Sequence, residues 1–197
     1  MKKWSGLPAL AAVILWGMTA SSFAADYVLD AAHTHVGFSV QHILSKVLGD
    51  FKSFDGTISF DEGDTSADKI DVTIQTASID TNNDMRNKHL QSPDFFDAVK
   101  YPTITFVSKK VTANGDKKYK VEGDLTIHGV TKTVVLDVTY LGHDVDPFGN
   151  QLVGFSATTT IDRRDFGLVW NKTLASGNLL VGNNVDIDLE ISANLKK

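Results

Sequence analysis

The sequence predicts an all-β fold built from about eight antiparallel strands. Apolar and polar residues alternate with a period of two over most of the chain, short turns rich in Gly, Asn and Asp separate these stretches, and helical patterns are scarce. Each strand is therefore apolar on one face only, and too little helix is available to cover those faces. Two packed sheets, or one sheet closed into a barrel, would both bury them.

The alternation is clearest in three stretches of the second half of the chain. Between residues 119 and 127, Tyr119, Val121 and Leu125 fall on one face of a strand, and polar residues fall on the other. The same alternation runs through residues 134–140 and 185–195. Weaker alternation predicts further strands at residues 35–43, 51–61, 70–76, 103–112 and 154–161.

Two turn sequences predict how neighbouring strands connect. Asn114-Gly115 offers residues that tolerate positive φ, so the strands at 103–112 and 117–127 should form a hairpin. His128-Gly129 favours a second tight turn, into a strand at 130–141. Strands joined by such short turns run antiparallel.

One short helix is expected at residues 84–90, with its N-cap within 81–83 and a stop at Ser92-Pro93. A second short helix is expected near residues 171–176. The carboxylates of Asp80 and Asp84 flank the start of the first helix, where a negative charge is favoured by the helix dipole. We therefore interpret them as capping residues, not as an acid–base pair.

Residues 1–24 have the pattern of a secretory signal peptide. Lys2 and Lys3 precede an apolar run from Leu7 to Ala20, and small residues stand three and one before the bond that follows Ala24. We expect cleavage after Ala24, which leaves one domain at residues 25–197. The apolar run is shorter than the roughly 20 residues that span a bilayer. A released, periplasmic protein without stable membrane insertion is therefore expected.

The composition excludes several classes of function. The sequence has no cysteine, so disulfides, thiolate zinc sites, iron–sulfur clusters and cysteine nucleophiles are ruled out. Loss of residues 1–24 removes two of 19 basic residues and none of 24 acidic residues, which leaves a net charge of −7. That charge argues against nucleic acid and anionic lipid surfaces as partners. No Gly-rich phosphate loop or nucleophile elbow is present, and no cofactor is indicated.

Histidines offer a candidate metal site. His33 and His35 are two residues apart, so both imidazoles would lie on one face of a strand. A third ligand is not evident beside them, and a structural role is the more common one for such histidines. The alternative function that follows is a small periplasmic metalloenzyme using His33, His35 and His42 with an acidic partner.

Three other conspicuous segments have plainer interpretations. Phe95-Phe96 is expected to belong to the core. Arg163-Arg164-Asp165 is expected to form a solvated or ion-paired rim. The segment that starts at Asp144 imitates a calcium loop, but Phe148 and Phe155 stand where ligands are needed, so a hairpin turn is expected.

A series of longer motifs spans nearly the whole of residues 25–197. They are Asp30-Ala31-Ala32-His33-Thr34-His35-Val36-Gly37-Phe38-Ser39-Val40-Gln41-His42, Gly49-Asp50-Phe51, Phe54-Asp55-Gly56, Phe60-Asp61, Ser78-Ile79-Asp80-Thr81-Asn82, Arg86, His89-Leu90, Phe95-Phe96-Asp97, Tyr101-Pro102, Phe106, Gly123-Asp124-Leu125-Thr126-Ile127-His128-Gly129-Val130-Thr131-Lys132 and Arg163-Arg164-Asp165-Phe166-Gly167. In this order they resemble the YceI-like family. Two residues depart from its pattern: Thr34 stands where the family often has Ser, and Asn87 where Asp often follows the Arg. These departures concern polar contacts and not the fold.

The resemblance implies an extended, lipocalin-like antiparallel barrel of about eight strands with one or two short helices. Such barrels are usually periplasmic and enclose a long isoprenoid or related amphiphilic lipid in an apolar tunnel. We expect a binding or carrier protein that is not an enzyme, and a homodimer is compatible with this expectation. The residues expected to contact lipid are Phe38, Val40, Ile58, Ile74, Phe106, Leu125, Ile127, Leu136 and Phe155, with Phe166 and Trp170 near a mouth.

Burial of the tail supplies the affinity in this interpretation. Each buried CH₂ group contributes about 0.8 kcal/mol, so one isoprene unit could contribute up to roughly 4 kcal/mol. A hydrocarbon lining separates tails that differ by one methylene by only about 1–3 kcal/mol, so selectivity must come from the head group. A third interpretation is a stress-related interaction protein whose barrel is filled by its own side chains.

Overall fold

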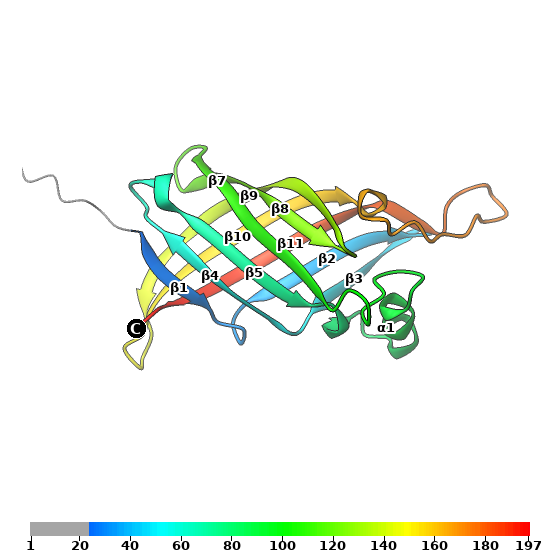
Figure 1. The fold of residues 1–197 in the computed structure, drawn as a ribbon, viewed down its shortest axis with the longest axis horizontal. Helices are drawn as coiled ribbons and strands as arrows, with labels where there is room; N and C mark the ends of the chain where they lie inside the picture. Colours follow the sequence, from blue (N-terminus) through cyan, green and yellow to red (C-terminus); the bar gives the residue numbers. More distant parts are fainter. Residues whose placement is uncertain (1–23) are drawn as a thin grey trace, which may run out of the picture.

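The computed structural model describes residues 24–197, which form an all-β barrel with one α-helix (Figure 1). The predicted antiparallel barrel is confirmed. Apart from Ala24, the predicted signal peptide lies outside the described residues. Within residues 24–197, no helix is both long enough and apolar enough to cross a membrane.

Eight antiparallel strands close the barrel. In order around it they are β1 (Ala25–Leu29), β4 (Phe54–Phe60), β5 (Lys69–Gln75), β7 (Thr103–Ala113), β8 (Lys118–Ile127), β9 (Val130–Val145), β10 (Gln151–Asp162) and β11 (Val181–Leu195). Closure occurs because β1 pairs with β4 on one side and with the end of β11 on the other. β9 has 16 residues and a strand of that length extends about 50 Å, so the barrel is elongated.

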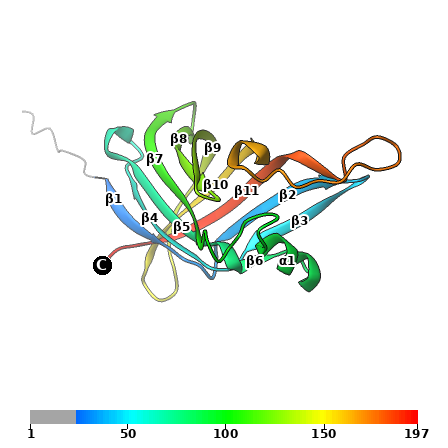
Figure 2. The same cartoon turned by 45° about the vertical axis from the view of Figure 1, so that its right-hand side comes forward.

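Three further strands form an extension of the sheet beside β11. They are β2 (His35–His42), β3 (Ser45–Phe51) and β6 (Ile79–Asp80). β11 pairs with β2 over most of its length and with β1 only at residues 193–195. The strand predicted at 35–43 therefore lies in this extension and not in the closed ring (Figure 2). The alternation did not mark β1, β3 or β6, which are short or irregular in pattern.

Both predicted hairpins are present. His128 and Gly129 have φ of 52° and 75°, and the first residues to pair across their turn are Ile127 and Val130. In the β7–β8 hairpin, positive φ occurs at Gly115 and Lys117, not at Asn114. The Asn114 N–H closes that turn by donating to the Lys118 carbonyl at 2.7 Å.

The first predicted helix is confirmed and the second is wrong. Helix α1 (Asp84–Gln91) begins after Asn83, whose side-chain oxygen accepts from the Arg86 N–H at 3.0 Å, and it ends before Pro93. Residues 171–176 belong to a narrow loop in which Thr173 pairs with Leu179. Local pairing to the returning chain therefore replaces helical hydrogen bonds in that segment. Short 3-10 turns occur at η1 (Thr65–Ala67), η2 (Thr76–Ser78) and η3 (Arg163–Phe166).

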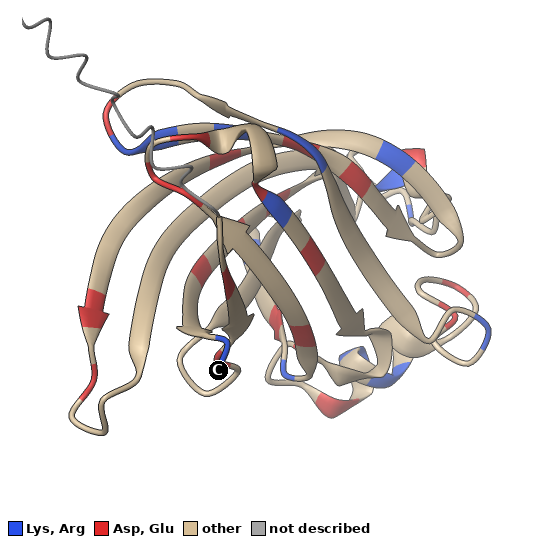
Figure 3. Cartoon of the chain, turned by 60° about the vertical axis from the view of Figure 1, so that its left-hand side comes forward, with Lys and Arg blue, Asp and Glu red and all other residues tan. Residues whose placement is uncertain are grey.

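The barrel interior holds two clusters of buried apolar residues. The first core cluster consists of Phe51, Ile79, Ile104, Phe106, Val121, Leu125, Ile127, Leu136, Phe166 and Leu168. The second core cluster consists of Ile58, Phe60, Tyr119, Tyr140, Val153, Phe155 and Ala193. Charged residues of both signs are interspersed over the strands and loops of the face shown in Figure 3, with no single basic surface. The polar positions of the alternating strands therefore meet solvent.

Candidate functional site

An apolar cavity of about 240 Å³ lies inside the barrel. Its lining takes residues from every barrel strand, from β2 and β3, and from α1 and the turn that follows it. Members of both core clusters line it, including Phe106 from the first and Phe155 from the second. This open space argues against a barrel that is filled by its own side chains.

Most of the residues predicted to contact lipid line this cavity. The nine that do so are Phe38, Val40, Ile58, Ile74, Phe106, Leu125, Ile127, Leu136 and Phe155. Phe166 is 1% exposed and packs in the first core cluster, outside the lining. Trp170 also lies outside the lining and packs against Phe95 and His89, with ring centroids 5.0 Å apart in both pairs. Contact with a lipid stays a prediction for all eleven.

Strand register explains why these side chains converge. Phe106 of β7 and Leu125 of β8 are direct cross-strand partners, so both face the same side of the sheet. Aromatic rings continue the wall toward α1, since Phe51 lies 5.8 Å from Phe38 and 6.1 Å from Phe96 between centroids. Phe95 also lines the cavity and is 8% exposed. Phe95 is therefore buried, as expected for a core residue, whereas Phe96 is half-buried and both rings also line the cavity.

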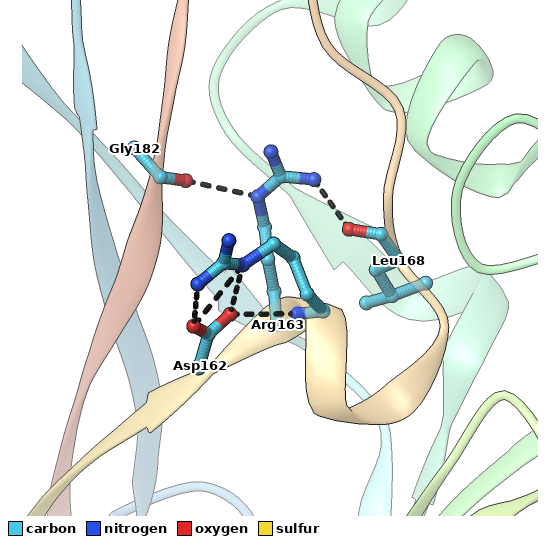
Figure 4. Close-up of polar contacts among 5 residues, drawn as sticks. Asp162, Arg163, Leu168 and Gly182 are labelled. Carbon is cyan, nitrogen blue, oxygen red and sulfur yellow. Dashed lines mark hydrogen bonds and ion pairs between the residues drawn. The ribbon is translucent and has the colours of Figure 1, made fainter. Parts of the chain in front are cut away.

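The expectation that Arg163-Arg164-Asp165 forms a solvated or ion-paired rim is wrong for Arg163. Arg164 is exposed and pairs with Asp162, but Arg163 is 4% exposed and lines the cavity. Its guanidinium donates to the backbone carbonyls of Gly182 and Leu168 (Figure 4). It also donates to the backbone carbonyl of Trp170 at 2.9 Å. The alternation of β10 could have predicted that Arg163 faces inward. Residues 155, 157, 159 and 161 line the cavity, and the next position in that series is 163.

Asp68 is a second polar group on the lining that the sequence did not single out. Its Oδ1 accepts from the Asp61 N–H at 2.9 Å, whereas its Oδ2 is buried without a hydrogen-bond partner among residues 24–197. Burial raises the pKa of the Asp68 carboxyl to about 6. Tyr119 belongs to the second core cluster, and its pKa is raised chiefly by burial. The nearby charge of Asp68 raises the pKa of Tyr119 further.

The histidines do not form the alternative metal site. His33 Nδ1 lies 2.7 Å from Asp30 Oδ2 in the turn before β2, and His35 and His42 occupy the two ends of β2. Those ends are seven residue steps, or about 23 Å, apart along the strand, so one ion cannot bind His33, His35 and His42 together. Among the described residues, no group of three or more His, Asp or Glu side chains is placed to hold a metal ion.

Asn87, which departs from the expected family pattern, has a defined structural role. Its Oδ1 accepts from the Thr81 N–H at 2.9 Å and from the Thr81 hydroxyl at 2.7 Å. Its Nδ2 donates to Asp80 Oδ1 at 2.9 Å. Hydrogen bonds from Asn82 and Asn87 lower the pKa of Asp80, which supports a turn-stabilising role for that carboxylate. The amide of Asn87 thus joins the start of α1 to β6.

Comparison with known proteins gives matches along most of the chain. Protein YceI of Escherichia coli O157:H7 is 46% identical over 151 residues, which cover 75% of this chain and 78% of that protein. The crystal structure of the Campylobacter jejuni YCEI protein has a TM-score of 0.69 and 39% identity, and the match covers 86% of this chain and 97% of that one. A polyisoprenoid binding domain from Saccharophagus degradans shares the fold at 20% identity, with a TM-score of 0.64 and coverage of 88% and 99%.

The family model of the YceI-like domain matches residues 27–193, from within β1 to near the end of β11. This range includes the β2–β3–β6 extension and all of the barrel except the first two residues of β1 and the last two of β11. The resemblance read from the motifs is thereby confirmed, and the chain belongs to the YceI-like domain family.

Proposed function

We propose that the protein is a periplasmic binding or carrier protein that holds a long-chain isoprenoid or related amphiphilic lipid in its barrel. The observation that supports this function is the apolar cavity, which extends through both core clusters of an elongated barrel. An aliphatic tail is the ligand class that such a lining favours, because each buried CH₂ group contributes about 0.8 kcal/mol. Association and ordering costs offset part of that gain.

Binding without covalent chemistry is the mechanism that the lining supports. Its ionisable side chains are Asp68, Tyr119 and Arg163. Acid–base or nucleophilic catalysis needs groups within hydrogen-bond reach of each other. No hydrogen bond or ion pair within residues 24–197 joins any two of these three side chains. The Saccharophagus degradans domain is described as polyisoprenoid binding, and the shared fold is consistent with the same general role.

Export to the periplasm is part of this proposal. Cleavage after Ala24 would leave β1 complete, since its first residue, Ala25, pairs with Phe60. Edman sequencing of the protein isolated from a periplasmic fraction should therefore begin at Ala25. Recovery of the uncleaved chain from the cytoplasm would contradict this part of the proposal.

A cavity-filling variant tests the binding function. Ala157 of β10 is 2% exposed and lines the cavity, whereas its neighbour Thr158 points outward and is exposed. We expect Ala157→Phe to weaken binding of geranylgeraniol by about tenfold or more, because the added ring occupies space that the tail needs. Thr158→Phe is the matched control and should bind as the unsubstituted protein does, with affinities measured by isothermal titration calorimetry.

Native occupancy gives an independent test. Mass spectrometry of an organic extract from protein purified from its own periplasm should detect a stoichiometric long-chain amphiphile. Failure of the purified protein to bind geranylgeraniol, a C18 fatty acid or a C18 amide would overturn the carrier function.

A further inference from the structure

Arg163 is a buried cation at the η3 end of the cavity. It lines the cavity beside Ile161 and Leu168, and its guanidinium carries five N–H donors. Nε donates to the Gly182 carbonyl at 2.9 Å, and Nη1 donates to the carbonyls of Leu168 and Trp170. These bonds join the start of β11 to the chain that follows η3, so they explain the positions of Nε and Nη1.

Those bonds do not account for the position of the third guanidinium nitrogen, Nη2. Arg163 Nη2 is buried and has no hydrogen-bond partner among the described residues. In Figure 4 it points away from the Gly182 and Leu168 carbonyls. A buried donor without a partner is destabilising, and native proteins rarely leave one unsatisfied. Nη2 is therefore a buried donor for which residues 24–197 supply no acceptor, on a residue that lines the cavity.

The charge of Arg163 is offset only in part, by the nearby carboxylate of Asp162. None of the ion pairs within residues 24–197 includes Arg163. The neighbouring carboxylate of Asp162 is engaged by Arg164, whose Nε lies 3.0 Å from Oδ1 and 3.1 Å from Oδ2. Burial lowers the pKa of Arg163, and the charge of Asp162 opposes part of that effect. An oxyanion would supply both the missing acceptor and a directly bonded counter-charge.

The opposite end of the cavity carries the opposite charge. Asp68 follows η1, which lies at the far end of the barrel from η3 (Figure 1). Its Oδ2 is buried on the lining without a donor. An oxyanion at that end would meet a like charge, whereas the apolar tail would meet Tyr119 and Phe155 of the second core cluster. The two ends therefore favour one orientation of an amphiphile.

We propose that Arg163 Nη2 anchors an oxyanion head group, such as a phosphate, of the amphiphile in the barrel, so that the head lies at the η3 end and the tail runs toward Asp68. This assignment rests on the proposed lipid-binding function and adds a head-group specificity to it. Arg163 is the specificity-determining residue because it is the buried cation on the cavity lining.

Two probes with the same tail test the anchor in the unsubstituted protein. Geranylgeranyl phosphate should bind about tenfold or more tightly than geranylgeraniol in calorimetric titrations, since a hydrogen bond to a charged group is typically worth about 1.5–3 kcal/mol. With ¹⁵N-labelled arginine, the phosphate should shift the guanidinium signals of one arginine, whereas geranylgeraniol should leave them in place. Inorganic phosphate alone should neither shift these signals nor displace geranylgeranyl phosphate.

Two arginine variants test whether Arg163 causes the preference for geranylgeranyl phosphate over geranylgeraniol. Arg163→Gln should lower the affinity for geranylgeranyl phosphate about tenfold and change that for geranylgeraniol less than about twofold. Arg164→Gln removes the neighbouring, exposed guanidinium and should keep the full preference. Circular dichroism verifies that each variant is folded, and the arginine spectra of the unsubstituted protein remain informative if Arg163→Gln does not fold.

The outcomes separate the two proposals. If neither prenyl probe binds, the carrier function fails. If geranylgeraniol binds and the phosphate binds no more tightly, only the anchor fails. The anchor is also overturned if folded Arg163→Gln keeps the preference, or if inorganic phosphate binds as well as the prenyl phosphate, because the site would then serve free phosphate.

Discussion

The Thr34 hydroxyl makes two hydrogen bonds to the backbone of Ser192: it donates to the carbonyl at 3.0 Å and accepts from the N–H at 3.1 Å. It does so in the turn between β1 and β2, the two strands that pair in succession with β11. The Ser192 carbonyl also accepts from the Asp30 N–H at 2.9 Å, so the Thr34 hydroxyl adds a second bond to that carbonyl and an acceptor for the Ser192 N–H. Serine at this position would carry the same hydroxyl.

Loss of this hydroxyl should destabilise the seam between β1 and β2. Thr34→Val keeps the shape of the side chain and leaves the Ser192 N–H without that acceptor, so we expect the free energy of unfolding to fall by about 1–2 kcal/mol. Thr34→Ser keeps the hydroxyl, so its free energy of unfolding should fall by less than half as much. Urea denaturation measures both values, and equal stability of the Val and Ser variants would disprove this role of the hydroxyl.

The fold was largely predictable because most strands carry their own signal. Period-two alternation and tight turns such as His128-Gly129 depend on neighbouring residues only. The β2–β3–β6 extension has no comparable signal, since β6 is two residues long and exists because it pairs with β3 at Phe51 and Asp50. The prediction of a helix at 171–176 failed for a different reason: Thr173 pairs with Leu179, only six residues along the chain, in place of helical hydrogen bonds.

The apolar wall of the site was also predictable, but its polar groups were not. Nine inward-facing residues follow from strand alternation. Arg163 lies in a pair of arginines that suggests a surface, and its burial depends on carbonyls from residues 168, 170 and 182. Asp68 lies in an acidic loop, and its approach to the cavity depends on the closure of the barrel. Long-range contacts of this kind leave little trace in local sequence.

Gly49 should be required for the position of Phe38 in the cavity wall. The two residues are cross-strand partners, and a methyl group on Gly49 would lie 2.4 Å from Phe38 Cζ and 2.8 Å from Thr81 Cγ2. We expect Gly49→Ala to lower the free energy of unfolding by about 1–3 kcal/mol and to weaken geranylgeraniol binding, because the ring must move.

Gly154 offers a matched control for this substitution. It is also a strand glycine, but a methyl group there would meet Leu141 Cβ at an ordinary 3.5 Å. Gly154→Ala should therefore change the free energy of unfolding less than Gly49→Ala does. If urea denaturation and calorimetry give the same values for both variants, the close approach of Phe38 has no energetic role.

Trp170 should report cavity occupancy through Phe95. After removal of residues 1–24, Trp170 is the one tryptophan in the sequence. It does not line the cavity, but its ring packs 5.0 Å from that of Phe95, which does. Geranylgeraniol should thus change Trp170 emission, and Phe95→Leu should remove most of the change while calorimetry still detects binding. An unaltered fluorescence response in Phe95→Leu would contradict this coupling.

Asp68 should make the protein less stable as the pH rises from about 4 to about 6. The pKa of its carboxyl is 3.8 in the absence of perturbation and about 6 in the folded barrel, so within this range the folded state holds the proton that the unfolded state has lost. The free energy of unfolding therefore decreases as the pH increases through the range. The full penalty, about 1–3 kcal/mol, is present above pH 6, and it vanishes below pH 4.

Asp68→Asn isolates this contribution. The amide oxygen can still accept from the Asp61 N–H, but the charge is lost, so the variant should be more stable than the unsubstituted protein at pH 7.5 and nearly equal to it at pH 3.5. Asp162, whose pKa is lowered to about 2 by its hydrogen bonds with Arg164, contributes equally to both proteins and cancels in the difference. Urea denaturation between pH 3.5 and 7.5 measures the difference, and a constant value over this range would show that Asp68 does not titrate inside the barrel.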